Sequence, residues 1–188
     1  YNKNADNFAK TTINVDFYET QNRFSTLLPE HGYILDFGCG SGRDTKYFLE
    51  QGFYVDATDG SEEMCHIASN YTGIQVRRLL FEELDENKKY EGIWACSSIL
   101  HLPKNELKAV FMKMFKALKE DGIIYTSFKY GDFEGERNGR YFTDFTEKTF
   151  EEFVGEINNL QLKEEWITGD VRPGRGEEKW LNVILQKN

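Results

Sequence analysis

The fold of this chain is decided by the stretch Tyr33-Ile34-Leu35-Asp36-Phe37-Gly38-Cys39-Gly40-Ser41-Gly42-Arg43. A short run with strand character comes first, glycines then stand at alternate positions, and a helical pattern of side chains follows Arg43. A strand, a glycine-rich turn and a helix start in this order are typical of the nucleotide-binding loop of a doubly wound α/β sheet. The glycines allow the backbone to turn sharply and to approach a ligand closely.

The carboxylate of Asp36 stands just before these glycines, and its charge separates two kinds of ligand. A helix start beside a glycine turn favours an anion such as the pyrophosphate of a dinucleotide, but a neighbouring carboxylate would repel that anion and attract a cation. A ligand with an adenosine half and a cationic amino-acid half fits both features, which favours S-adenosylmethionine. The dinucleotide pattern G-x-G-x-x-G also fails here, because Arg43 stands at the position of its last glycine.

The composition indicates one globular domain. With 188 residues, of which 39% are hydrophobic, the chain can bury a sizeable core. The formal net charge of −9 opposes non-specific binding to nucleic acid or to an anionic membrane, and no apolar run approaches the length of a membrane span. We expect a domain over residues 16–188 and, before it, an arm or lid over residues 1–15.

The cysteines and histidines give no sign of a disulfide framework or of a metal site. The three cysteines are widely spaced without a C-x-x-C motif, so we expect reduced thiols in a cytoplasmic protein. The three histidines lack the spacing of metal ligands, and we expect no bound metal. The first residues lack the pattern of a signal peptide, so we expect none.

Strand and helix patterns alternate along the chain. The expected strands cover residues 33–37, 53–58, 74–80, 92–96, 123–129, 160–168 and 180–186. The expected helices cover residues 16–28, 43–51, 103–118 and 146–157, with one more that begins at Ser61. The alternation predicts an α/β fold, with a single doubly wound, mostly parallel seven-stranded sheet and helices on both faces. No helix separates the final two strands, which predicts an antiparallel last strand.

Asp59 follows the second expected strand and lies 21 residues after Gly38. An acidic residue about 20 residues beyond the glycines, at the end of the second strand, is placed to accept hydrogen bonds from both ribose hydroxyls of a nucleoside. Alternatively, Asp59 caps the helix that begins near Ser61. The two roles are compatible.

The motifs in order resemble those of class I S-adenosylmethionine-dependent methyltransferases, and the tail is similar to a small bacterial type-11/type-12-like subgroup. The resemblance rests on Asp36-x-Gly38-x-Gly40-x-Gly42, Asp59-Gly-Ser-x-x-Met64, the stretch from Gly92 through Cys96 to His101, and the strand after Asp121-Gly122. The resemblance covers about residues 33–130. The sequence from there to residue 187 is compatible with the end of the same fold. Each motif alone is modest, whereas all of them in order at these spacings are specific.

The resemblance implies a set of cofactor contacts. Asp36, Gly38 and Gly40 would hold the methionine end, and Asp59 would bind the ribose. Gly60 or Met64 would flank the adenine. Many relatives end the third strand in an acid that reads the adenine amine, but Leu80 and Phe81 stand there, so Glu82 or Glu83 would substitute and Phe81 is either an adenine contact or a core residue. The candidate cofactor-binding residues within these motifs are Asp36, Gly38, Cys39, Gly40, Asp59, Gly60, Met64, Phe81, Glu82 and Cys96.

His101 and Tyr141 are the candidate catalytic residues. His101 follows the fourth strand at the carboxyl edge, where open sheets bind ligands, and it either contacts the acceptor and takes its proton or caps the next helix and packs under the edge. Methyl transfer needs no catalytic triad, because the sulfonium donor is already activated and the enzyme mainly aligns the acceptor with the methyl group.

The expected loops 130–145 and 169–178 gather arginines and aromatic side chains at the same edge. They supply the candidate acceptor-binding residues Tyr130, Arg140, Arg172 and Arg175. This grouping suggests an anionic or planar small molecule, unless the arginines only pair with nearby acids in solvated loops.

We therefore expect methyl transfer from S-adenosylmethionine to a small-molecule acceptor, anionic or aromatic. The alternatives are an NAD-linked oxidoreductase and a non-catalytic module that only binds the cofactor. A nucleic-acid methyltransferase is disfavoured by the negative charge. It is also disfavoured because residues 96–99 read Cys-Ser-Ser-Ile and not Asn-Pro-Pro-Tyr.

Overall fold

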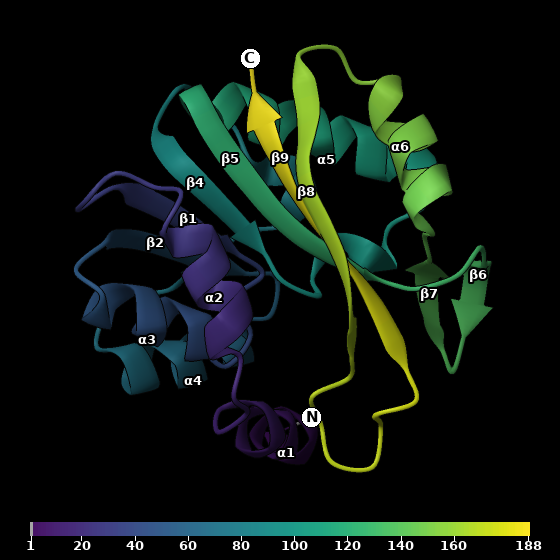
Figure 1. Ribbon diagram of the computed structural model, residues 1–188. Helices are drawn as coiled ribbons and strands as arrows, with labels where there is room; N and C mark the ends of the chain where they lie inside the picture. Colours follow the sequence, from purple (N-terminus) through teal and green to yellow (C-terminus); the bar gives the residue numbers. More distant parts are fainter. Residues whose placement is uncertain (1) are drawn as a thin grey trace.

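A seven-stranded sheet forms the centre of the computed structural model, which describes residues 2–188 (Figure 1). The strand order across the sheet is β3-β2-β1-β4-β5-β9-β8. In that order the strands are β3 (Arg77–Arg78), β2 (Tyr54–Asp59), β1 (Tyr33–Phe37), β4 (Tyr90–Ala95), β5 (Leu118–Lys129), β9 (Lys179–Lys187) and β8 (Leu160–Gly169). β9 pairs antiparallel with both β5 and β8, and the other pairings are parallel. The expected sheet and its antiparallel last strand are confirmed.

Helices cover both faces of the sheet (Figure 1). Phe24 and Phe48, from two of the helices, pack with Trp94 and Tyr125 on one face. Phe111 and Phe150, from two others, pack on the opposite face. Both faces of β1 and β4 are therefore covered, which explains why these strands read as nearly continuous apolar runs. The helices are α1 (Asn2–Thr12), α2 (Tyr18–Ser25), α3 (Arg43–Glu50), α4 (Glu62–Thr72), α5 (Lys104–Ala117) and α6 (Glu147–Gly155), with short 3₁₀ turns η1 (Phe81–Glu83) and η2 (Ile99–His101).

The third strand is much shorter than residues 74–80. β3 consists of Arg77 and Arg78, which are both exposed at the edge of the sheet and pair with the end of β2. The chain then makes one further backbone hydrogen bond to β2, from Leu79 N–H to the carbonyl of Asp59 (3.0 Å), and turns into η1. Charged residues on a short edge strand limit further pairing.

The segment expected as a loop over residues 130–145 contains a β-hairpin. Its strands are β6 (Glu134–Arg137) and β7 (Arg140–Thr143), which pair antiparallel. The connection is Asn138-Gly139, and both residues have positive φ angles, 53° and 75°. These angles fit the two-residue turns that match the twist of a hairpin. In Figure 1 the hairpin lies at one side of the sheet, below α6.

Among the described residues, none of the helices has both the length and the apolar character needed to cross a membrane.

Candidate functional site

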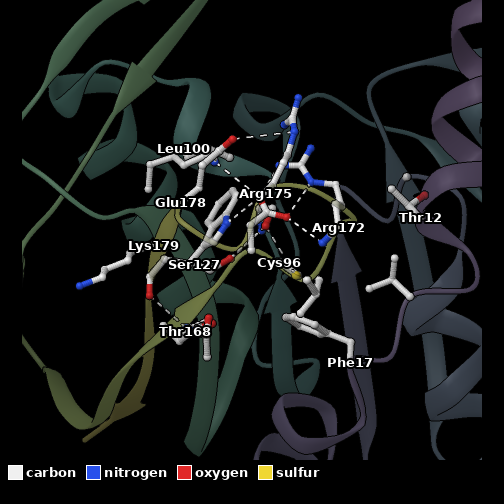
Figure 2. A pocket seen from close by; sticks show the side chains of 18 of the residues that line it. Thr12, Phe17, Cys96, Leu100, Ser127, Thr168, Arg172, Arg175, Glu178 and Lys179 are labelled. Carbon is white, nitrogen blue, oxygen red and sulfur yellow. Dashed lines mark hydrogen bonds and ion pairs between the residues drawn. The ribbon is translucent and has the colours of Figure 1, made fainter.

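A cavity of about 1040 Å³ opens at the carboxyl ends of β1, β4 and β5, where open α/β sheets bind ligands. Its wall combines the glycine loop after β1, the segment from Cys96 to His101, the β6–β7 hairpin and the loop between β8 and β9. Thr12 and Phe17 line it on one side, and Thr168 and Lys179 lie on the other in Figure 2. Of the residues proposed from the sequence, it brings together Gly38, Cys39, Gly40, Cys96, His101, Tyr130, Arg140, Arg172 and Arg175.

The glycine loop is fixed by hydrogen bonds to the end of β2. The N–H groups of Gly38 and Cys39 both donate to the carbonyl of Thr58, at 2.9 and 2.8 Å. Gly38 has a φ of 83°, and a Cβ at this position would lie 2.5 Å from the Cβ of Ser98. Only glycine fits there, because any side chain would collide with Ser98.

Asp59 ties the glycine loop to the start of α4. One carboxylate oxygen accepts the N–H of Gly40 and the other accepts the N–H of Ser61, both at 2.9 Å. The helix cap itself is Ser61, whose hydroxyl accepts the N–H of Met64 at 3.3 Å. Asp59 does not line the cavity. Each carboxylate oxygen keeps a further lone pair, so Asp59 remains able to accept a ribose hydroxyl, and that role remains a prediction.

Asp36 lies beneath the glycine loop, and it is not part of the cavity wall. Its side chain is 2% exposed, and one oxygen accepts the hydroxyl of Thr45 at 2.5 Å. Burial raises the pKa of Asp36 above its usual value, and the nearby charge of Asp44 adds to the effect. The structure therefore does not bring a charged Asp36 carboxylate to the cavity, and its contact with the methionine end of the cofactor remains a prediction.

Arg43 is a partly buried cation on the cavity wall that the sequence reasoning did not single out as a site residue. Its guanidinium makes two hydrogen bonds to Asp44, at 2.8 and 2.9 Å, and lies 4.6 Å over the ring of Phe17. Asp44 also accepts hydrogen bonds from Gln21 at 2.7 Å and from Trp94 at 2.9 Å. Burial opposes ionisation of Asp44, but these partners outweigh it and lower its pKa. The cavity thus has a rigidly held positive charge at the start of α3.

His101 presents one ring nitrogen to a backbone partner from the hairpin. Its Nδ1 lies 2.8 Å from the carbonyl oxygen of Tyr141, and its ring packs edge-on to Phe142 at 4.6 Å between centroids. A carbonyl only accepts hydrogen bonds, so Nδ1 carries the proton and Nε2 keeps its lone pair. Burial lowers the pKa of His101, and the charge of Arg140 lowers it further. The imidazole is therefore neutral at pH 7.

The side chain of Tyr141 points away from the cavity. Its hydroxyl donates to Glu134 at 3.3 Å, and Tyr141 is absent from the cavity wall. Successive side chains of a strand point to opposite faces, so Arg140 and Phe142 line the cavity and Tyr141 does not. The structure gives Tyr141 a place at the site through its backbone carbonyl, whereas the hydroxyl proposed for catalysis is not brought there.

Most of the cations at the far end of the cavity are paired with acids. Asp170 is buried and accepts hydrogen bonds from Arg172 and from the indole of Trp180, and Lys129 lies 3.6 Å from it. Burial opposes its ionisation, but the bonds from Arg172 and Trp180 outweigh it and lower the pKa of Asp170 well below its usual range. Tyr130 lines the cavity as well, and its hydroxyl donates to Glu147 at 2.8 Å.

Comparison with known proteins agrees with this geometry. Residues 34–122 match the family model described as a methyltransferase domain. The chain is 33% identical over 116 residues to YqeM of Bacillus subtilis, a protein whose name assigns it to the methyltransferases. That alignment covers 56% of this chain and 47% of YqeM, so the chain spans about half the length of this relative.

Solved structures show the same fold over most of the chain. The 1,6-didemethyltoxoflavin-N1-methyltransferase of Burkholderia thailandensis, with bound 1,6-didemethyltoxoflavin and S-adenosylhomocysteine, is 25% identical. The match covers 90% of this chain and 77% of that enzyme, with a TM-score of 0.75. A methyltransferase of Methanosarcina mazei gives a TM-score of 0.77 at 15% identity, over 92% of this chain and 99% of that one.

Over residues 34–122 the chain is therefore similar to a methyltransferase domain, and its fold is that of S-adenosylmethionine-dependent methyltransferases. The residues expected to surround the adenine do not line the cavity. Phe81 packs edge-on to Phe37 at 4.9 Å and lies beside Gly38, which agrees with a core residue. The others lie beyond the glycine loop, at the ends of β2 and β3 and the start of α4: Gly60, Met64 and Glu82.

The helix α1 lies over the glycine loop. Phe8 of α1 would lie 3.5 Å from a Cβ at Gly40, and the hydroxyls of Thr12 and Ser41 are 3.1 Å apart. Within the arm expected over residues 1–15, of which Tyr1 lies outside the described residues, Asn2–Thr12 form this helix. Sequence reasoning missed the helix because Ala9 is its one clearly buried apolar residue among those described.

Proposed function

We propose that this chain transfers a methyl group from S-adenosylmethionine to a small-molecule acceptor that is anionic or aromatic. The observation that carries the proposal is that the glycine loop and His101 line one cavity. Its volume, about 1040 Å³, leaves room for the methionine end of the cofactor together with a small acceptor. The 1,6-didemethyltoxoflavin in the Burkholderia enzyme supports a small molecule as acceptor.

The residues present fit the cofactor. Gly38 and Gly40 line the cavity without side chains, and the guanidinium of Arg43, which is paired with Asp44, lies on the same wall. Asp59 retains acceptor capacity for ribose hydroxyls, and Gly60 and Met64 would face the adenine. When bound, S-adenosylmethionine supplies a methyl group that is already activated on a sulfonium and is transferred by in-line displacement.

The role of His101 in this reaction is to accept a proton. Its Nδ1–H is held by the carbonyl of Tyr141, so the lone pair of Nε2 is available to an acceptor O–H or N–H. Because the pKa of His101 is lowered, the ring is already in its basic form at neutral pH. Leu100, which also lines this part of the wall, helps to exclude water from the acceptor.

The three cysteines are free thiols in the structure. Free thiols are compatible with a reducing compartment, and the proposal therefore places the protein in the cytoplasm.

Calorimetry tests the proposed function directly. S-adenosylmethionine, S-adenosylhomocysteine and NAD are titrated into the wild type, into Asp59→Ala, and into the control Asp85→Ala, which removes an exposed carboxylate outside the cavity wall. We expect micromolar binding of the first two ligands, weakened at least tenfold in Asp59→Ala and unchanged in the control. Binding of NAD instead, or of none of the three, would overturn the proposal.

A further inference from the structure

The acceptor end of the cavity carries more positive than negative side chains. Some of these positive side chains form ion pairs with acids, and others do not. Arg172 and Lys129 are held by Asp170, and Lys129 also pairs with Glu178. Arg175 lies 3.8 Å from Glu178. These charges are already compensated within the loop between β8 and β9, so an incoming anion would have to displace a carboxylate to reach them.

The β6–β7 hairpin contributes two more arginines, one compensated by an acid and one not. Arg137 makes two hydrogen bonds to Asp144, at 2.8 and 3.0 Å, which compensates its charge. Within residues 2–188, no carboxylate lies within ion-pair distance of Arg140, although this side chain lines the same cavity. Its guanidinium is also close enough to His101 to lower the pKa of that imidazole. Lys179, at the start of β9, also lines the cavity without an ion pair among the described residues, but Arg140 is the uncompensated cation beside the proposed proton acceptor.

A flat surface lies next to Arg140. Phe142 is two residues further along β7 and lines the same wall. The guanidinium of Arg137 lies 4.6 Å over the ring of Phe142, and the imidazole of His101 packs against that ring at 4.6 Å. Asp144 and the Tyr141 carbonyl hold these two groups in place. Planar side chains fixed in this way favour a planar ligand, through stacking and cation–π contacts.

We propose that the β6–β7 hairpin is the acceptor-recognition element and binds a planar carboxylate. Its carboxylate group pairs with Arg140, its ring lies along Phe142, and its reacting O–H or N–H faces Nε2 of His101. This inference rests on the proposed function, and it assigns the anion to Arg140, leaving Arg172 and Arg175 as parts of a structural ion network. A single arginine with two parallel N–H donors suits a carboxylate.

Matched pairs of small ligands test the proposal. The probes are 4-hydroxybenzoate against 4-hydroxybenzamide and anthranilate against anthranilamide, titrated by calorimetry into protein saturated with S-adenosylhomocysteine. We expect the carboxylates to bind more tightly than the amides. In Arg140→Gln the carboxylates should lose roughly ten- to hundredfold in affinity, as for a charge-assisted hydrogen bond, whereas the amides change little. Arg78→Gln, at the edge of the sheet, is the control and should leave every affinity unchanged.

A second readout separates recognition from folding. In Arg140→Gln the affinity for S-adenosylhomocysteine should match the wild type, and the pKa of His101, followed by NMR, should rise because a neighbouring positive charge has been removed. Equal binding of amides and carboxylates, no binding of any probe, or a loss confined to Arg175→Gln would each overturn the proposal. Failure to bind S-adenosylhomocysteine would instead overturn the proposed function.

Discussion

Nδ1 of His101 lies 2.8 Å from the carbonyl oxygen of Tyr141, so a strand of the hairpin fixes the orientation of the imidazole that lines the cavity. The hydrogen bond leaves Nε2 as the free basic atom. Burial and Arg140 both keep the ring neutral by lowering its pKa from 6.5. The behaviour of His101 with pH is therefore a direct test of its role.

We expect the NMR signal of His101 to titrate below pH 6.5. Methyl transfer to an O–H or N–H acceptor should be fully active at neutral pH and should decline as the pH falls through this lowered pKa, because protonated Nε2 no longer accepts a proton. His101→Gln should reduce kcat by about 10²–10⁴-fold and leave the affinity for S-adenosylhomocysteine unchanged. A mutant with normal kcat would remove His101 from the mechanism.

Gly38→Ala tests whether the glycine loop is constrained by its contact with Ser98. The added Cβ would lie 2.5 Å from the Cβ of Ser98, at a φ of 83°. Gly139→Ala is the matched control, because its φ is 75° and nothing lies within 4 Å of the added atom. We expect the control to lose about 1 kcal/mol of unfolding free energy, and Gly38→Ala to lose about 2 kcal/mol more. Chemical denaturation measures both, and equal losses would contradict the steric account.

Asp36→Asn tests the raised pKa of the buried carboxyl. Above pH 3.8 the unfolded chain has lost this proton, whereas the folded chain retains it up to the raised pKa. The folded state therefore loses stability from Asp36 as the pH rises through this window, by about 1.4 kcal/mol per pH unit at most. Asparagine still accepts the Thr45 hydroxyl but does not titrate. The stability of Asp36→Asn relative to wild type should rise between pH 5 and pH 8, and a constant difference would contradict the raised pKa.

Phe8→Ala tests α1 as a lid. Phe8 lies over Gly40, and the Thr12 hydroxyl is 3.1 Å from that of Ser41. Loss of the ring should open the cofactor end of the cavity, so release of S-adenosylhomocysteine should become several-fold faster in stopped-flow measurements. Met112→Ala, which shortens an exposed side chain on α5, should leave the release rate unchanged. An unchanged rate in Phe8→Ala would exclude a lid function for this helix.

The sequence allowed prediction of the elements whose signals are local. The glycine turn after β1 and the antiparallel closing strand follow from residue types at fixed spacing, and the structure confirms both. The hairpin was missed even though Asn138-Gly139 is a strong turn signal, because its strands are short and charged. Recognising it would also have shown that Tyr141 and Arg140 point to opposite faces.

Other parts of the site depend on contacts between distant residues. Arg43 becomes a fixed cation because Gln21 and Trp94, from α2 and β4, hold its partner Asp44. The charge of Arg172 is likewise compensated by Asp170, which also accepts a hydrogen bond from Trp180 of β9. No spacing rule on a single sequence reveals such partners, since they meet only after the sheet has formed.

The position of β9 has a consequence for how the protein is made. This strand follows every other described strand in the chain, yet it lies between β5 and β8 and carries Trp180 and Asn182 into the cavity wall. Until residues 179–187 emerge from the ribosome, the apolar edge of β5 has no partner, and such an edge invites pairing with other chains. The nascent protein can therefore form its cofactor-binding half early, but it gains a complete acceptor wall, and a covered β5 edge, only when β9 is inserted.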